Sequence, residues 1–207
     1  MDALDDLFEK RPPGPVYFAI TPDADAAHDA ERATRPLRAQ NRLTGVPLPP
    51  EALHVSLLGI GWRPELRREV VEAACAAAAS VTMPPFEIAF DRAGSFAGQS
   101  DWPWVLFGGD GVIGAEMLQR ALISALERAG FNFEKRRYEP HMTLLYDRRR
   151  LTAQLIAPVR WRVQEFVLIH GLHGLARHIR LGRWKLPGPQ IEVGRPRCSD
   201  PTNDYPL

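Results

Sequence analysis

Two short segments of the chain carry a histidine and a hydroxyl residue in the same pattern. The first reads His-Val-Ser-Leu-Leu at residues 54–58, and the second reads His-Met-Thr-Leu-Leu at residues 141–145. Both are rich in apolar residues and follow a proline-containing stretch, so we expect each to form a β-strand. Because side chains alternate along a strand, His54 shares one face with Ser56, and His141 shares one face with Thr143.

Two such strands facing one cleft would supply the groups for phosphoryl chemistry without a metal. One neutral imidazole can take a proton from water or a ribose hydroxyl, while the opposite protonated imidazole gives a proton to the leaving oxygen. Imidazole suits both tasks because its unperturbed pKa is about 6.5. The hydroxyls of Ser56 and Thr143 would hold the non-bridging phosphate oxygens. We therefore expect His54 and His141 to be catalytic, and Ser56 and Thr143 to bind substrate.

A single motif of this kind is also typical of an ordinary strand histidine whose hydrogen bonds are satisfied in the core. The repetition is more informative. The chain has six histidines, and two of them lie in the same pattern of an apolar residue, a hydroxyl residue and a leucine. By crude residue frequencies, such a coincidence would arise by chance in about one chain in a thousand. The pair therefore favours a functional site over two structural histidines.

The surrounding sequence predicts strands alternating with helices. Strands are expected at 16–21, 53–58, 86–90, 104–107, 141–146, 160–169 and 179–186. Helices are expected at 24–43, 63–81 and 112–129. Pro36 should interrupt the first helix, Pro64 should lie in the first turn of the second, and Gly59 and Gly61 should end the second strand.

The composition predicts one cytoplasmic domain. The chain has 207 residues, 45% of them apolar, which is enough for a single core. It contains no apolar run of the roughly 18–20 residues that a membrane span needs, and its acidic N-terminus is unlike a signal peptide. Cys75 and Cys198 form no disulfide framework or metal-binding pattern. We expect a flexible leader at 1–14, the domain at 15–186 and a proline-rich flexible tail at 187–207.

The charges are unevenly spread, although the net charge is only +1. Residues 1–131 carry 12 Lys and Arg against 18 Asp and Glu, whereas residues 132–207 carry 14 against 7. The second part could contribute an anion-binding face, but a solvated mixed surface is equally consistent with these counts. The histidines at 170, 173 and 178 match no standard zinc spacing, so we expect no metal site there.

Further motifs make the sequence resemble the two-histidine phosphoesterases, and within them the bacterial RNA 2′,3′-cyclic phosphodiesterases formerly called 2′-5′ RNA ligases. The resemblance covers about residues 15–186. Its motifs are Pro50-x-x-Leu53-His54, Gly94-Ser95-Phe96, Glu134-x-Arg136-x-Tyr138-x-Pro140-His141 and Leu181-Gly182-x-Trp184-x-Leu186. It implies an α+β fold of two similar lobes, each an antiparallel sheet backed by helices, with both histidines in the cleft between the lobes.

The resemblance also implies roles for individual residues and no cofactor. His54 would be the proton donor, and His141 the proton acceptor that activates water. Arg136 matches the family pattern and would contact substrate phosphates. Tyr146 stands where many members carry a basic residue, and its hydroxyl could reach the substrate. Gly171 stands where related members often have serine.

The expected activity is hydrolysis of the 2′,3′-cyclic phosphate at RNA 3′ ends, or of small cyclic-phosphate nucleotides, to 2′-phosphates by a monomer. Two alternatives stay open. One is a module that binds RNA ends or nucleotides with little turnover. The other is a phosphoesterase of the same fold that acts on another cyclic phosphate or on a 2′-5′ linkage.

Overall fold

The computed structural model describes residues 13–97, 101–134, 137–172 and 177–187. Its strands are β1 Gly14–Ile20, β2 Val55–Arg63, β3 Phe86–Ser95, β4 Trp102–Phe107, β5 His141–Asp147, β6 Gln154–Val163, β7 Glu165–Leu172 and β8 Arg177–Lys185. Its helices are α2 Ala24–Gln40, α3 Arg68–Ala79 and α4 Ile113–Arg128, and two short 3-10 turns, η1 Pro50–Ala52 and η2 Asp110–Val112, precede β2 and α4. The expected leader and tail lie almost entirely outside the described residues.

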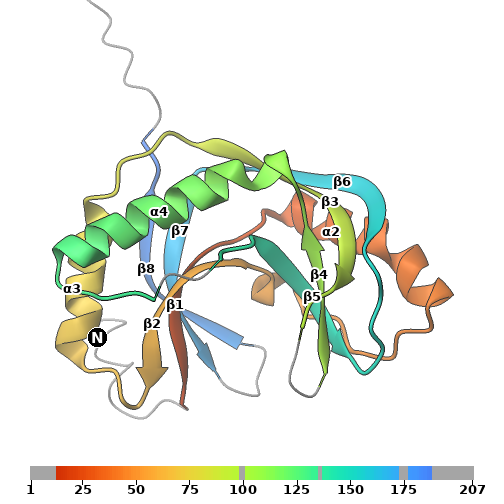
Figure 1. Ribbon diagram of the computed structural model, residues 1–207, viewed down its shortest axis with the longest axis horizontal. Helices are drawn as coiled ribbons and strands as arrows, with labels where there is room; N and C mark the ends of the chain where they lie inside the picture. The colour runs from red at the N-terminus through yellow and green to blue at the C-terminus, as the bar shows by residue number, and fades with distance from the viewer. Residues whose placement is uncertain (1–12, 98–100, 135–136, 173–176, 188–207) are drawn as a thin grey trace, which may run out of the picture.

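The described strands form one eight-stranded sheet in the order β6-β3-β4-β5-β2-β1-β7-β8, and neighbouring strands are antiparallel. We call β6, β3, β4 and β5 the His141 half, and β2, β1, β7 and β8 the His54 half; they lie to the right and left in Figure 1. Between β2 and β5, the described ladder consists of Val55 paired with Met142. The α+β class is confirmed, and the two expected sheets are continuous through this pair.

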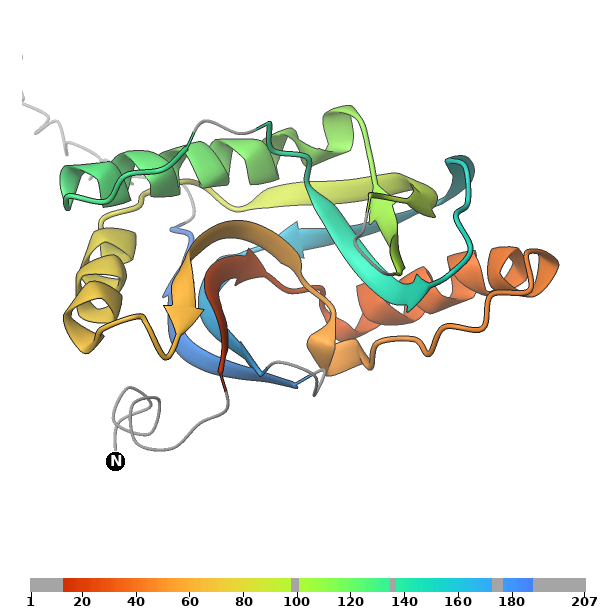
Figure 2. The same cartoon turned by 60° about the horizontal axis from the view of Figure 1, so that its bottom comes forward.

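The helices cover the sheet face that carries the main core. Helix α4 buries Leu118, Leu122 and Leu126 at helical spacing and contacts β2 and β3, one strand from each half. Helix α3 contacts α4 and β8, and α2 contacts β6. Figure 2 shows α3 (yellow) adjoining α4 (green), with α2 (orange) apart from both. None of the described helices is both long and apolar enough to cross a bilayer.

Strand β1 is buried on both faces. Val16, Phe18 and Ile20 belong to the main core. The alternate residues Tyr17 and Ala19 form a smaller cluster with residues of β7 on the other face. His54 and His141 are found on this second face, as described below.

Helix α2 continues through Pro36, so the expected interruption is wrong. A proline in a helix removes the hydrogen bond to the carbonyl four residues earlier. A cap and a buried face stabilise this helix despite that loss. Asp23 caps the helix by accepting a 2.8 Å hydrogen bond from the Ala26 amide. The helix also buries a face that includes Ala30 and Thr34.

Strand β2 extends past both glycines to Arg63, so the strand end expected there is also wrong. Gly59 pairs with Tyr17 and Gly61 pairs with Val16, at an irregularity in the ladder between β1 and β2. Gly61 has a φ of +153°, which glycine adopts without strain. Because β2 takes up the residues to Arg63, helix α3 starts at Arg68 rather than at residue 63.

The single strand expected at 160–169 is two strands, β6 and β7, separated by Gln164. Val163 pairs with Phe86 in the His141 half, whereas Glu165 pairs with Lys185 in the His54 half. The chain changes partners here without a glycine or proline, so the sequence carries no turn signal at this point.

A buried carboxylate at the end of β5 holds the segment that leads to the first histidine. Asp147 is 3% exposed and accepts hydrogen bonds from the amides of Thr44 (2.6 Å), Gly45 (2.7 Å) and Arg149 (2.8 Å). Burial alone would raise the pKa of Asp147, but these hydrogen bonds lower it below its usual value. Further along, the Leu48 amide donates to the Leu144 carbonyl at 2.7 Å. The segment from residue 44 to residue 48 is thus fixed against β5.

We expect Asp147→Ala to lower the free energy of unfolding by about 2–3 kcal/mol, because it leaves buried amides without an acceptor. Urea denaturation at pH 7 measures this change. Because the folded pKa is depressed, the contribution is present above the unfolded pKa of about 3.9 and is lost as the pH falls through the folded value. The control is Asp29→Ala, whose ion pair with Arg32 is exposed and should change stability by less than about 0.5 kcal/mol. Equal stabilities of the Asp147 variant and the wild type would contradict the prediction.

Candidate active site

The structure brings the two histidine motifs together on the neighbouring strands β2 and β5. Extending the antiparallel register of Val55 and Met142 by one residue each way places His54 opposite Thr143, and Ser56 opposite His141. Side chains directly opposite each other on one face of such a pair have Cβ atoms about 4.5–5.5 Å apart. The pair thus brings both motifs to one junction, and on this register we expect a compact array in which each imidazole lies across from a hydroxyl.

Both imidazoles are anchored by a hydrogen bond to the backbone carbonyl two residues earlier. The Nδ1 atom of His54 lies 2.9 Å from the Ala52 carbonyl oxygen, and the Nδ1 atom of His141 lies 2.7 Å from the Glu139 carbonyl oxygen. A carbonyl can only accept a hydrogen bond, so Nδ1 carries the proton in each ring. In the neutral ring of each histidine, Nε2 is therefore the nitrogen that can accept a proton.

Each histidine also packs against an aromatic ring. The ring centroids of His141 and Phe96 are 4.9 Å apart, which gives the Gly94-Ser95-Phe96 motif a structural role. His54 lies 5.2 Å from the ring of Tyr17 and 4.8 Å from the ring of His178. These contacts restrict rotation of both imidazoles.

The environment of His54 favours its neutral form. Burial lowers the pKa of His54 below its usual value, the hydrogen bond to the Ala52 carbonyl opposes that shift, and the nearby charge of His141 adds to it. His141 is thus close enough to influence the protonation of His54.

The remaining predicted site residues have different positions. Ser56 is exposed and Thr143 is half-buried, so both hydroxyls can reach a ligand. Tyr146 is 54% exposed and lies close enough to Tyr17 to raise the pKa of that phenol further, after the larger effect of burial. Arg136 lies outside the described residues, and its phosphate contact stays a prediction from the sequence.

An irregularity in β5 explains the direction of Tyr146. Strict alternation would place Tyr146 on the face opposite His141. The register with β4 shifts at Leu144, because Trp104 pairs with Leu145 whereas Val105 pairs with Thr143. Both leucines of the motif are consequently buried, and Tyr146 is exposed beyond them.

Tyr138 connects the two motifs. Its hydroxyl donates a 2.9 Å hydrogen bond to the backbone carbonyl of Ser56, so the segment leading to His141 is tied to the strand that follows His54. The spacing from Tyr138 to His141 is part of the motif that carries the family resemblance, and the structure gives it this positional role.

Sequence reasoning missed Tyr17 and His178 as site residues. The sequence places Tyr17 in an expected strand without marking it as functional, and the spacing of the histidines around His178 bears only on a metal site. The structure places His178 beside His54, whereas His170 is fully buried on the other face of the sheet, next to Val16 in the ladder. Among the described residues, no group of three His, Cys, Asp or Glu side chains could hold a metal ion.

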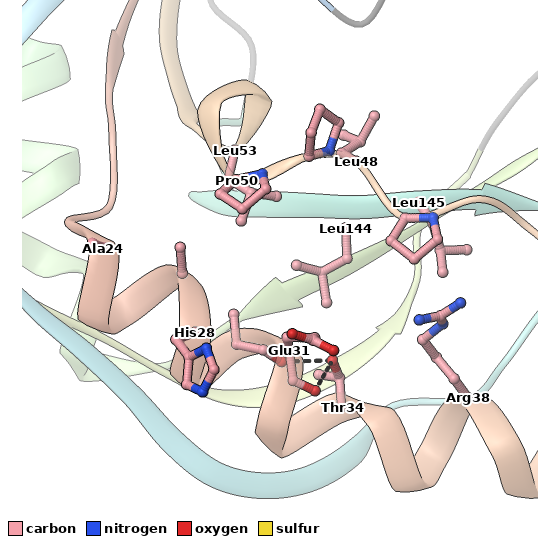
Figure 3. A pocket seen from close by; sticks show the side chains of 14 residues that line it. Ala24, His28, Glu31, Thr34, Arg38, Leu48, Pro50, Leu53, Leu144 and Leu145 are labelled. Atoms are coloured by element: carbon pink, nitrogen blue, oxygen red, sulfur yellow. Dashed lines mark hydrogen bonds between the residues drawn. The ribbon is translucent and has the colours of Figure 1, made fainter.

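An apolar cavity of about 470 Å³ lies away from this array. Figure 3 shows it between α2 and the segment before His54, with Leu144 pointing into it and His28, Glu31 and Arg38 along its helical side. His54 and His141 do not line it. The cavity is therefore separate from the candidate active site.

Comparisons with known proteins show the family of this chain. A family model of the 2′-5′ RNA ligase superfamily matches residues 21–174, and the chain belongs to that superfamily. The expected relationship to the two-histidine phosphoesterases is thereby confirmed. No curated protein sequence matches the chain significantly.

Several solved structures share the fold. A crystal structure of a phosphoesterase is 23% identical with a TM-score of 0.67, and the match covers 84% of this chain and 98% of that chain. Escherichia coli LigT complexed with 3′-AMP is 24% identical with a TM-score of 0.65 and the same coverage. A protein of Thermus thermophilus is 23% identical with a TM-score of 0.61, covering 84% and 99% of the two chains. E. coli LigT has also been crystallised with NADP+, phosphate and ATP.

We expect the imidazole of His54 to titrate below about 6.5, its usual value, and His141→Gln to raise that pKa by removing a neighbouring positive charge. NMR titration of the ring resonances measures both values. Because the folded pKa is lowered, the unfolded chain binds more protons just below pH 6.5, so His54 lowers stability as the pH falls there. The variant His28→Gln, at an exposed histidine of α2 that is not among the groups acting on His54, should leave the titration of His54 unchanged. A His54 pKa at or above 6.5 in the wild type would rule out this electrostatic description.

Proposed function

We propose that this protein is a metal-independent phosphodiesterase that hydrolyses 2′,3′-cyclic phosphates, at RNA 3′ ends or on small nucleotides, to 2′-phosphates. The observation that carries this proposal is the array of two imidazoles and two hydroxyls on adjacent strands, with each imidazole anchored through Nδ1. Membership of the 2′-5′ RNA ligase superfamily supports the phosphoester class. The nucleotides and phosphate bound to E. coli LigT support a ligand of this kind. We place the activity in the cytoplasm, on a monomer.

In the proposed reaction, a water molecule attacks the phosphorus atom of the cyclic phosphate. The Nε2 atom of His141 takes a proton from this water as the new P–O bond forms. The bond from phosphorus to O3′ breaks, and the Nε2–H group of His54 gives its proton to O3′. The product carries a free 3′-hydroxyl and a 2′-phosphate. After the reaction, His141 carries one more proton and His54 carries one fewer. Proton exchange with water restores both histidines to their starting forms.

The substrate itself would bring His54 into the protonated form that an acid requires. The pKa of His54 is lowered in the free protein, whereas an anionic phosphate within a few ångströms favours the charged imidazole. Ser56 and Thr143 would donate hydrogen bonds to the non-bridging oxygens, on which charge accumulates as water adds. The two hydroxyls thus act on the phosphate while the two imidazoles act on the oxygens entering and leaving it.

We expect His54→Ala and His141→Ala each to lower the rate at least about a hundredfold, because each removes a general acid or base. Phosphorus NMR of a nucleoside 2′,3′-cyclic phosphate, and of a short RNA bearing that end, follows the conversion and identifies which oxygen keeps the phosphate. EDTA treatment should leave the wild-type rate unchanged. The variant His28→Ala, at an exposed histidine of α2, is the matched control and should retain full activity.

The same experiment separates the alternatives. Loss of turnover after EDTA treatment would contradict metal-independent catalysis. Binding of a 2′-nucleotide without turnover of either cyclic substrate would favour a binding module. Turnover of a different cyclic phosphate or of a 2′-5′ linkage alone would keep the chemistry and change the substrate.

We expect Ser56→Ala and Thr143→Ala each to lower kcat/KM about tenfold or more. A hydrogen bond to a charged group contributes about 1.5–3 kcal/mol, and about 1.4 kcal/mol corresponds to a factor of ten. Steady-state kinetics on the nucleoside cyclic phosphate measure the loss, and Ser56→Thr, which keeps the hydroxyl, should lose less than Ser56→Ala. Wild-type kinetics of both alanine variants would remove these hydroxyls from the site.

A further inference from the structure

Three aromatic rings from three separate parts of the chain pack together at His54. Tyr17 comes from β1 and His178 from β8, and both rings contact the imidazole of His54. The ring of Tyr17 is tilted by 36° to that of His54, and the ring of His178 meets that of His54 at 84°. Tyr17 and His178 also contact each other in a T-shaped arrangement, with centroids 6.2 Å apart. His54 is therefore enclosed from two directions.

A hydrogen bond fixes the two surrounding rings relative to each other. The Tyr17 hydroxyl and the Nε2 atom of His178 are 3.2 Å apart. Burial raises the pKa of Tyr17, so its hydroxyl keeps its proton and is the donor. Burial, followed by the nearby charge of His54, lowers the pKa of His178 to about 4, so its neutral ring is the acceptor near neutral pH.

The backbone of the neighbouring strand leaves room for this arrangement. Gly171 of β7 is the ladder partner of His178. A Cβ atom at Gly171 would lie 3.4 Å from Cε1 of Tyr17 and 3.6 Å from its hydroxyl oxygen. A larger side chain at Gly171 would therefore compete with the Tyr17 ring for the same space.

The geometry points to Tyr17 and His178 as a positioning pair for His54, a role that rests on the proposed function. The two hydrogen-bonded rings hold the His54 imidazole so that Nδ1 stays on the Ala52 carbonyl and Nε2 stays directed at the phosphate. Neither side chain needs to touch the substrate in this role. The pair also makes the two histidines unequal, because His141 has Phe96 as its aromatic neighbour, which offers no polar group.

The protonation of His54 depends on groups from several elements. Tyr17 faces it from β1, His178 from β8 and His141 from β5, while Tyr146 of β5 acts on Tyr17. Replacing His178 with alanine admits water to the imidazole of His54. Because burial is the largest cause of the lowered pKa of His54, this change should raise that pKa toward its usual value.

The test uses Tyr17→Phe, which removes the hydroxyl and keeps the ring, together with His178→Ala and His178→Gln, of which only Gln keeps an acceptor. Nitrogen-15 NMR of the imidazoles, with and without inorganic phosphate, reports the tautomer and pKa of His54. We expect one Nδ1–H tautomer in the wild type, and a mixture of tautomers with a raised pKa in His178→Ala. We expect kcat to fall about fivefold to tenfold in Tyr17→Phe and His178→Ala with little change in KM, and His178→Gln to retain more activity than His178→Ala.

Two results would overturn the positioning role. One is a His54 tautomer and pKa in folded His178→Ala that equal those of the wild type. The other is an unchanged kcat with a raised KM, which would mean that these side chains bind the substrate directly. If the wild type turns over no cyclic phosphate but the His54 resonances change as expected, the positioning pair is supported and only the proposed substrate is refuted. His28→Gln again serves as the control that should alter neither readout.

Discussion

The pairing of Val55 with Met142 is the constraint on which the site depends, because it is where the described sheet passes from one half to the other. Side chains alternate along strands, so a shift of one residue at this junction would turn a histidine away from its partner. The hydrogen bond from Tyr138 to the Ser56 carbonyl reinforces the same register from outside the sheet. Helix α4 supports both sides of the junction, since it packs on β2 and on β3. A short ladder, one side-chain hydrogen bond and one helix thus set the spacing of the two imidazoles.

The two histidines share a local anchor but have different surroundings. In both motifs, Nδ1 donates to the carbonyl two residues earlier, which the chain can arrange without any distant contact. The wider environment then separates them: His54 is enclosed by Tyr17 and His178, whereas His141 packs against Phe96. Burial lowers the pKa of His54 and favours its neutral form in the free protein, so the proposed acid role requires the charge of the bound phosphate to restore the proton.

The parts of the site that could be predicted from the sequence are those with a local signal. The period of two along a strand relates His54 to Ser56, and the repeated motif relates His54 to His141. The contact between Tyr17 and His178 joins residues 161 positions apart and depends on the strand order, which no short pattern encodes. The fold was mispredicted where tertiary contacts override local preference. Pro36 stays inside a helix that has a cap and a buried face, and the break at Gln164 exists because two different strands, rather than one, pair with the residues on either side of it.

The order of the strands along the chain has a consequence for the way the protein is made. The His141 half is one continuous segment, residues 86–163, with helix α4 inside it, so all of its own ladders form within that segment. The His54 half is divided by that segment: β1 and β2 emerge from the ribosome first, but β1 pairs with β7, where Val16 meets His170. Closing so long a loop is entropically slow. The pair of β1 and β2 therefore keeps the free edge of β1 unpaired until β7 has been synthesised, and the surroundings of His54 are completed only when β8 follows.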